Sequence, residues 1–151
     1  MAQKYQCPDE FETVGFDVFH KARNEVDLYD GVLEMLEYVS QHYTVISITN
    51  GNADVNQVGL GKYFDFGITA SLAGAAKPDP VIFNKALSWG DFQPHEVIHI
   101  GDDPIRDVRG AANLGMKTIW VNTRQQPWPG GLPADAEITQ ISHLVDSIKS
   151  L

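Results

Sequence analysis

The sequence predicts an α/β protein in which helices cover both faces of a parallel sheet. Short β-branched apolar runs alternate along the chain with stretches of helical length, a pattern typical of Rossmann-like, three-layer folds. Polar residues and glycines follow directly after two of the apolar runs, where ligands bind in such folds. The 151 residues, 43% hydrophobic and 21% charged, suit one globular domain.

The first half of the predicted domain holds a helix and two strands. Apolar residues recur at helical spacing over 31–42, which predicts an amphipathic helix. Residues 44–48, TVISI, predict a buried strand that runs into the turn sequence Thr49-Asn50-Gly51-Asn52. A second strand is predicted at 66–70.

The second half continues the alternation. Pro78-Asp79-Pro80 opens a helix that is predicted to run through Leu87. Residues 97–100, VIHI, predict a strand that stops at Gly101-Asp102-Asp103-Pro104. A helix over 105–114 is then expected to end at Gly115. Strands at 117–121 and 137–138 and a helix over 141–150 complete the predicted core.

Charge and composition exclude several classes of function. The net charge of −9 repels nucleic-acid phosphates, so no nucleic-acid partner is expected. No apolar run approaches the roughly 20 residues that span a bilayer, so no membrane partner is expected either. One cysteine, Cys7, allows no internal disulfide, which fits a reducing compartment, and we expect a cytoplasmic protein.

Residues at two strand ends and one loop suit the binding of a phosphate. Thr49 can donate its hydroxyl proton, and Asn50 and Gly51 can donate their backbone N–H groups. Lys77 can neutralise a phosphate oxygen. Donors and positive charge are what a phosphoryl group needs where negative charge builds up. Read singly, these residues could be only a tight turn and a solvated lysine.

A carboxylate cluster follows the strand at 97–100. Asp102 and Asp107 are hard oxygen ligands of the kind that Mg²⁺ prefers, and Asp103 is a third candidate ligand. Asp103 could instead cap the following helix. The sequence therefore predicts Mg²⁺ as the cofactor.

Three motifs in order resemble motifs two, three and four of the haloacid dehalogenase superfamily. They are Ile48-Thr49-Asn50-Gly51-Asn52, then Ala76-Lys77-Pro78-Asp79-Pro80, then Ile100-Gly101-Asp102-Asp103 with Asp107. The resemblance extends from about Asn24 to the C-terminus and is to the branch with a small helical cap. That branch includes haloacid dehalogenases and phosphatases of small phosphorylated metabolites. The run from Ile48 to Asp65 is especially similar to flavin-mononucleotide phosphatases and related nucleotidases.

The resemblance implies a role for each of these residues. Thr49 would hydrogen-bond the transferring phosphoryl group, and Lys77 would stabilise the nucleophile and the charge on pentacoordinate phosphorus. Asp102 would bind Mg²⁺. Asp107 would assist either as a second Mg²⁺ ligand or by contacting the groups that bind the ion. In the full-length family enzyme, an aspartate attacks phosphorus and water then hydrolyses the acyl-phosphate.

The family's first motif, an apolar strand that ends in Asp-x-Asp, has no match, because no Asp-x-Asp occurs in this chain. Asp17 is the nearest candidate nucleophile. Lys21 stands where a threonine is expected, and Thr49 follows Asp17 by only 32 positions, which leaves no room for a cap. We therefore interpret 1–27 as a remnant of the cap and its connector, and 28–151 as the core domain.

The missing motif has a structural consequence. In the family, its strand lies between the strands that end at Thr49 and Asp102, so its loss exposes two strand edges. The two strands could pair directly, the N-terminal segment could insert, or another chain could cover the gap. The resulting expectation is self-association through the exposed edges.

The leading functional hypothesis is a Mg²⁺-dependent phosphomonoester hydrolase for a small phosphorylated metabolite, present here in a truncated form that is inactive alone. One alternative is a 2-haloacid dehalogenase, which needs no metal. Another is a non-catalytic phosphate-binding or regulatory module. A third is a piece cut from a longer enzyme.

Overall fold

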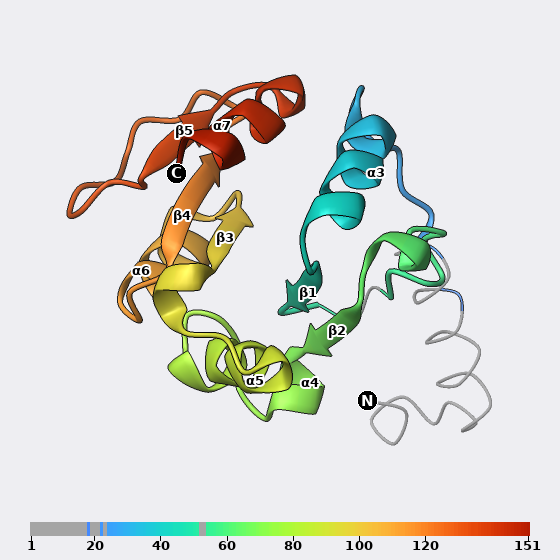
Figure 1. The fold of residues 1–151 in the computed structure, drawn as a ribbon, viewed down its shortest axis with the longest axis horizontal. Helices are drawn as coiled ribbons and strands as arrows, with labels where there is room; N and C mark the ends of the chain where they lie inside the picture. The colour runs from blue at the N-terminus through green and yellow to red at the C-terminus, as the bar shows by residue number, and fades with distance from the viewer. Residues whose placement is uncertain (1–17, 19–21, 23, 52–53) are drawn as a thin grey trace, which may run out of the picture.

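The computed structural model describes residues 18, 22, 24–51 and 54–151. Most of the segment 1–27, which we interpret from the sequence as a cap remnant, lies outside the described residues. Cys7 and Asp17 are among the residues not described. The elements below keep the labels of Figure 1.

The first half of the described chain has the elements that the sequence predicts, with one addition. Helix α3 spans Val32–His42, strand β1 spans Ile46–Thr49 and strand β2 spans Phe66–Thr69. A one-turn helix, α4 over Ala70–Ala73, was not predicted. It begins where the Thr69 hydroxyl accepts a hydrogen bond from the Leu72 N–H at 3.1 Å.

The second half begins with α5, which extends past the predicted end at Leu87 to span Pro80–Gly90. The Asp79 side chain caps this helix by accepting from the Val81 N–H at 2.9 Å. The remaining elements are strands β3 (Ile98–Gly101), β4 (Lys117–Val121) and β5 (Ala136–Ile138), and helices η3 (Pro104–Arg109), α6 (Gly110–Ala112) and α7 (Leu144–Ser150). Short 3₁₀ turns, η1 (Gly61–Tyr63), η2 (Pro94–Glu96) and η4 (Ile141–His143), complete the set.

The helix predicted over 105–114 is not a regular α-helix. Its first part, η3, is a π-helical turn, in which the Val108 N–H donates to the Asp103 carbonyl at 3.2 Å. The Asp107 N–H donates to the same carbonyl at 3.0 Å. This wider turn carries Asp107 into the interior, where it is buried. Gly115, at φ 86°, then ends the segment as the sequence predicts.

The strands are parallel, as predicted, but they form two sheets. β1 pairs with β2, and β4 lies between β3 and β5. Figure 1 shows the two groups of strands on different sides of the molecule, with α4 and α5 on the path between them. β1 and β3 are not paired with each other. Direct pairing of these two strands, one of the three ways to repair the gap, is therefore absent.

Helices pack on both faces of the strands, as a three-layer fold requires. On one face, Ile82 and Phe83 of α5 pack with Ile68 of β2. On the other face, Val39 of α3 packs with Leu144 of α7 and with the β4–β5 strands. Among the described residues, no helix is long and apolar enough to cross a membrane.

Candidate active site

The carboxyl end of β1 presents Thr49 in a local turn. The Thr49 Oγ1 accepts a hydrogen bond from the Gly51 N–H at 3.0 Å, a side-chain turn typical of threonine. This bond occupies the Gly51 N–H that the sequence assigns to phosphate binding. It leaves the Thr49 hydroxyl proton available to donate, because a hydroxyl both donates and accepts.

The Asn50 side chain clamps the backbone of Lys77. Its Oδ1 accepts from the Lys77 N–H at 2.6 Å, and its Nδ2 donates to the Lys77 carbonyl at 2.9 Å. The sequence assigns Asn50 only a backbone N–H donor, so this clamp was missed. An asparagine carries both a donor and an acceptor, yet no local pattern shows that its partner lies 27 residues away.

Lys77 joins the two sheets at their carboxyl ends. Its Nζ donates to the Ile48 carbonyl at 2.8 Å and lies 2.7 Å from the Asp107 Oδ1. The two side chains are 13% and 6% exposed, so this ion pair is nearly buried. The alternative that Lys77 is a solvated surface lysine is therefore wrong.

Asp107 is held ionised by its surroundings. Burial alone would raise its pKa, but the polar contact with His99 and the hydrogen bond and charge of Lys77 outweigh burial. The Asp103 N–H adds a bond to Oδ2 at 3.0 Å. Together they hold the pKa of Asp107 well below its usual range. Asp107 also fills the space beside Gly101, where a Cβ would lie 2.4 Å from its carboxyl carbon.

His99 lies beside the Lys77–Asp107 ion pair. The sequence predicts only that His99 belongs to a strand. Its Nε2 lies 3.6 Å from the Asp107 Oδ1, an electrostatic contact too long for a hydrogen bond. Its ring packs edge-on against Phe83 at 5.2 Å between centroids. His99 thus contacts both Phe83 of α5 and the buried Asp107.

Asp102 and Asp103 have different surroundings. Asp102 is exposed, and its carbonyl accepts from the Trp120 Nε1 at 2.9 Å. The Asp103 Oδ1 accepts from the N–H groups of Ile105 and Arg106 at 2.9 and 2.8 Å. Asp103 is therefore the helix cap that the sequence gives as the alternative to a metal ligand.

Of the three predicted Mg²⁺ ligands, Asp102 is the one whose carboxylate is not engaged by another residue in the described part of the chain. Among the residues that the structure places, no three His, Cys, Asp or Glu side chains gather into a metal cluster. Asp103 caps η3 and Asp107 pairs with Lys77, so Asp102 is left facing solvent. Mg²⁺ often takes only one or two carboxylates and completes its shell with water and substrate phosphate. Asp102 fits that role, with Asp107 behind it.

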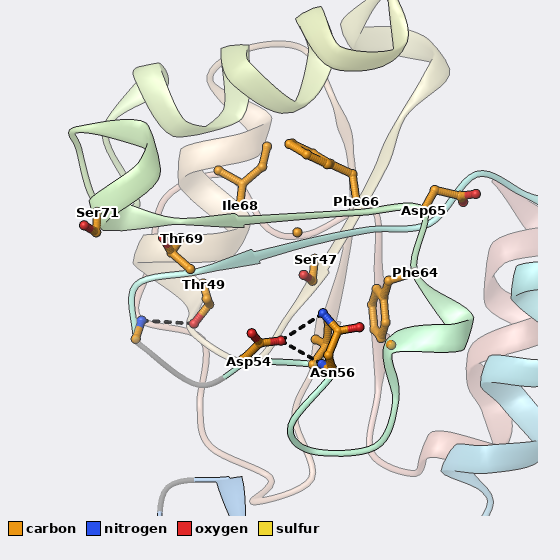
Figure 2. A pocket seen from close by; sticks show the side chains of 14 residues that line it. Ser47, Thr49, Asp54, Asn56, Phe64, Asp65, Phe66, Ile68, Thr69 and Ser71 are labelled. Carbon is orange, nitrogen blue, oxygen red and sulfur yellow. Dashed lines mark hydrogen bonds between the residues drawn. The ribbon is translucent and has the colours of Figure 1, made fainter. Parts of the chain in front are cut away.

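A cavity of about 510 Å³ meets this site at Thr49 and Gly51. Figure 2 shows Ser47 and Thr49 projecting from one face of the β1–β2 sheet toward Asp54 and Asn56, while Ile68 projects from the opposite face. The Asp54 Oδ1 accepts from the Asn56 N–H at 2.7 Å. The cavity lining thus combines hydroxyl, amide and carboxylate groups with apolar side chains, among them Val55 and Phe64.

The fold and this site define a class of protein. It is a parallel α/β protein. At the carboxyl ends of two of its strands lie the Thr49 hydroxyl, the Lys77 ammonium paired with Asp107, and the exposed Asp102 carboxylate. The chain belongs to the haloacid dehalogenase-like hydrolase family, whose family model matches residues 2–121.

The chain is similar to both phosphatases and a dehalogenase. The chain is 31% identical over 134 residues to the 5-amino-6-(5-phospho-D-ribitylamino)uracil phosphatase YigB of Escherichia coli, covering 86% of this chain and 56% of that protein. It superposes on the 2-haloacid dehalogenase of Pseudomonas syringae pv. Tomato with a TM-score of 0.90 at 35% identity, covering 93% of this chain and 61% of that one.

A HAD phosphatase from Thermococcus onnurineus superposes with a TM-score of 0.74 at 29% identity, covering 81% of this chain and 58% of that one. The chain thus spans less than two thirds of the length of each of these three proteins.

Proposed function

We propose that this chain supplies the phosphate-binding and metal-binding side of a Mg²⁺-dependent phosphomonoester hydrolase. The observation that carries this proposal is the position of Lys77, whose ammonium is fixed between the Ile48 carbonyl and Asp107. This arrangement puts a positive charge at the carboxyl ends of β1 and β3 in a chain with a net charge of −9. An anionic substrate needs such a local charge.

Lys77 and Thr49 have donors to offer a phosphoryl group. An ammonium has three N–H donors, and Ile48 and Asp107 engage two of them. The third can donate to a phosphate oxygen. The Thr49 hydroxyl already accepts from Gly51, so its proton can be donated to a second oxygen of the same group.

Asp102 would hold Mg²⁺ through its exposed carboxylate. When bound, the ion would draw electron density from a phosphoryl oxygen and offset the negative charge of the substrate. The indole N–H of Trp120 holds the Asp102 carbonyl and so fixes the backbone from which this carboxylate extends. Asp107 holds the Lys77 ammonium in place through the ion pair.

The substrate class that we propose is a small phosphorylated metabolite. Its support is the family of the chain together with the phosphatase relatives, one of which acts on a phosphorylated ribitylaminouracil by its name. The sequence contains no Asp-x-Asp. We therefore expect this chain alone to bind phosphate without turning over an ester.

The experiment is hydrolysis of 4-nitrophenyl phosphate with and without Mg²⁺, by the chain and by its Asp102→Asn and Asp17→Asn variants. Binding of inorganic phosphate is measured in parallel by calorimetry. Phosphate binding that weakens in a Lys77→Met variant, without ester turnover, is the expected result. Turnover that both aspartate variants abolish would make Asp17 the nucleophile. A chain that binds no phosphate in the presence of Mg²⁺ would overturn the proposal.

A second candidate is a 2-haloacid dehalogenase. It is favoured by the superposition on the P. syringae dehalogenase and by the engagement of Asp103 and Asp107 away from a metal. Lys77 and Thr49 suit a carboxylate substrate as well as a phosphate. Release of chloride from 2-chloropropionate in the presence of EDTA would favour this candidate, because a Mg²⁺-dependent phosphatase would be inactive there.

A further inference from the structure

The loop between β4 and β5, residues 122–135, starts at the same edge of the sheet as the candidate site. β4 runs parallel to β3, and Trp120 of β4 lies opposite Gly101 of β3. Asp102 is the next residue after Gly101. Because neighbouring parallel strands present their carboxyl ends at one edge, the loop leaves the sheet beside Asp102.

Asn122 fixes the first part of this loop. Its side chain is nearly buried, at 4% exposed. Its Oδ1 accepts from the Gln126 N–H at 2.8 Å, and its Nδ2 donates to the Gln126 carbonyl at 2.9 Å. The same Nδ2 donates to the Glu137 Oε1 of β5 at 2.6 Å. The loop is therefore closed into a ring at its start and joined to the neighbouring strand.

Arg109, at the end of η3, holds the far part of the loop. Its guanidinium donates to the Gly130 carbonyl and lies 6.0 Å from the centre of the Trp128 ring, within the range of a cation–π contact. A Cβ at Gly131 would lie 3.0 Å from the Arg109 Nη2, so glycine lets the loop backbone approach the arginine. The planar guanidinium of arginine suits such a combined contact with a ring and a carbonyl.

Trp128 in turn packs against Trp120. The two rings meet edge to face, with 5.1 Å between centroids and 72° between planes. Trp120 is 2% exposed, and its Nε1 donates to the Asp102 carbonyl at 2.9 Å. A series of contacts thus runs from Arg109 through Trp128 and Trp120 to the backbone of Asp102.

Arg106 offers a comparison on the same helical turn. Its guanidinium pairs with Asp103 at 3.5 Å and its side chain is 64% exposed, whereas Arg109 contacts the loop. Each arginine is a cation near the carboxylate of Asp102, and a cation there disfavours the binding of Mg²⁺ by repulsion. The contacts with the loop are therefore what distinguishes Arg109 from a second surface charge.

We propose that Arg109 is a positioning residue for Asp102. It holds the loop so that Trp128 packs against Trp120, and the Trp120 indole N–H then stays bonded to the Asp102 carbonyl. The orientation of the Asp102 carboxylate thus depends on a residue seven positions further along the chain that does not touch it. The consequence for Mg²⁺ rests on the proposed function, which assigns the ion to Asp102.

The first test needs no metal. Hydrogen exchange of the Trp120 indole N–H is followed by NMR in the native chain, in Arg109→Met and in the matched control Arg106→Met. We expect Arg109→Met to speed this exchange by about fivefold or more, the effect of weakening one hydrogen bond, and Arg106→Met to leave it unchanged. Trp128→Leu keeps an apolar side chain but lacks the ring, and it should act as Arg109→Met does.

The second test is the affinity for Mg²⁺, measured from the stabilisation that added Mg²⁺ gives in thermal melts. Arg109→Met should raise the dissociation constant by about fivefold. Arg106→Met should leave it unchanged or lower it, because only a repelling charge is lost. Adding Arg109→Met to Trp120→Phe should weaken binding no further, since both changes break one series of contacts and their effects are not additive.

Two results would overturn the proposal. One is unchanged exchange of the Trp120 indole N–H in folded Arg109→Met and Trp128→Leu. The other is a response to Mg²⁺ that is the same in Arg109→Met as in Arg106→Met, which would make Arg109 a surface charge only. A native chain that Mg²⁺ does not stabilise would instead contradict the proposed function, and the indole exchange would still decide whether Arg109 positions Asp102.

Discussion

The ammonium of Lys77 and the carboxylate of Asp107 form a nearly buried ion pair, with 2.7 Å between Nζ and Oδ1, that ties the end of β1 to the end of β3. The lysine reaches Asp107 from the loop before α5, and the π-helical turn after β3 aims Asp107 back toward it. The two residues are 30 positions apart in the sequence, so this contact holds the two halves of the core together.

Removing the lysine should destabilise the fold strongly. Lys77→Met leaves the Asp107 carboxylate buried without its cation, and breaking such a pair costs about 3 kcal/mol or more. Urea unfolding measures the loss. The matched control is Lys117→Met, because the Lys117 Nζ lies 4.0 Å from the Asp135 Oδ1 with half of its side chain exposed. That change should cost less than about 1 kcal/mol, and equal losses in both variants would contradict the buried pair.

Stability should fall in acid because of Asp107. Its pKa is depressed in the folded state from an unfolded value of about 3.9. The carboxylate therefore contributes its full stability above about pH 4, and that contribution is lost as pH falls below this value. We expect the difference in unfolding free energy between the native chain and Asp107→Asn to shrink as pH drops from 5 to 2, by at most about 1.4 kcal/mol per pH unit. A difference that stays constant over this range would rule out Asp107 as the titrating group.

Asp103 should behave as a cap and not as a metal ligand. Asp103→Ala removes the acceptor for the N–H groups of Ile105 and Arg106 and should cost about 1 kcal/mol, while Asp103→Asn should cost little, because asparagine caps equally well. Thermal melts with and without Mg²⁺ separate the two roles. Asp103→Asn should keep the stabilisation by Mg²⁺ and Asp102→Asn should lose it; the reverse result would make Asp103 the ligand.

The Asn50 clamp should matter for the position of Lys77. Asn50→Ala removes both hydrogen bonds to the Lys77 backbone, while Asn50→Asp keeps the acceptor and loses the donor. At about 1 kcal/mol for each hydrogen bond, the alanine variant should lose about 2 kcal/mol of stability and the aspartate variant about half of that or more. Phosphate affinity should fall in both, which calorimetry can measure. Unchanged affinity in a folded Asn50→Ala variant would show that the clamp does not position the lysine.

Trp120 should position the backbone of Asp102. Trp120→Phe keeps an aromatic ring at a site that is 2% exposed but removes the N–H that bonds the Asp102 carbonyl. The expected cost is about 1 kcal/mol together with weaker binding of Mg²⁺. Trp89→Phe is the control, because Trp89 stacks on Phe66 away from Asp102. If both variants bind Mg²⁺ as tightly as the native chain, the hydrogen bond has no positioning role.

The sequence predicts elements well where local pattern and burial agree. β4 has the predicted bounds because KTIWV is strongly β-forming, and its central residues are buried. α3 begins within one residue of its predicted start because its apolar stripe packs inward. In both cases the same residues determine the local conformation and the core contact.

Contacts over long range were less predictable. In the π-helical turn, the Asp107 and Val108 N–H groups donate to the Asp103 carbonyl, and Asp107 contacts Lys77. Neither contact is visible in the hydrophobic period of the sequence. The structure places Lys77 in contact with Ile48, next to Thr49, and with Asp107, at strand ends where parallel strands share an edge. The partners of these residues, the Asn50 side chain and His99, depend on atomic packing that a motif does not encode.

The ion pair between Lys77 and Asp107 requires a glycine at position 101, because the Asp107 side chain packs against the Gly101 Cα. The Asp107 carboxylate occupies the volume that a Cβ at position 101 would take, at 2.4 Å. Even a methyl group would push the counter-ion away from its lysine. In a library that samples every substitution, position 101 should therefore rank among the least tolerant, although glycine itself offers no charge, proton or ligand atom from a side chain. Selection at this position therefore acts on the space that the Asp107 carboxylate requires.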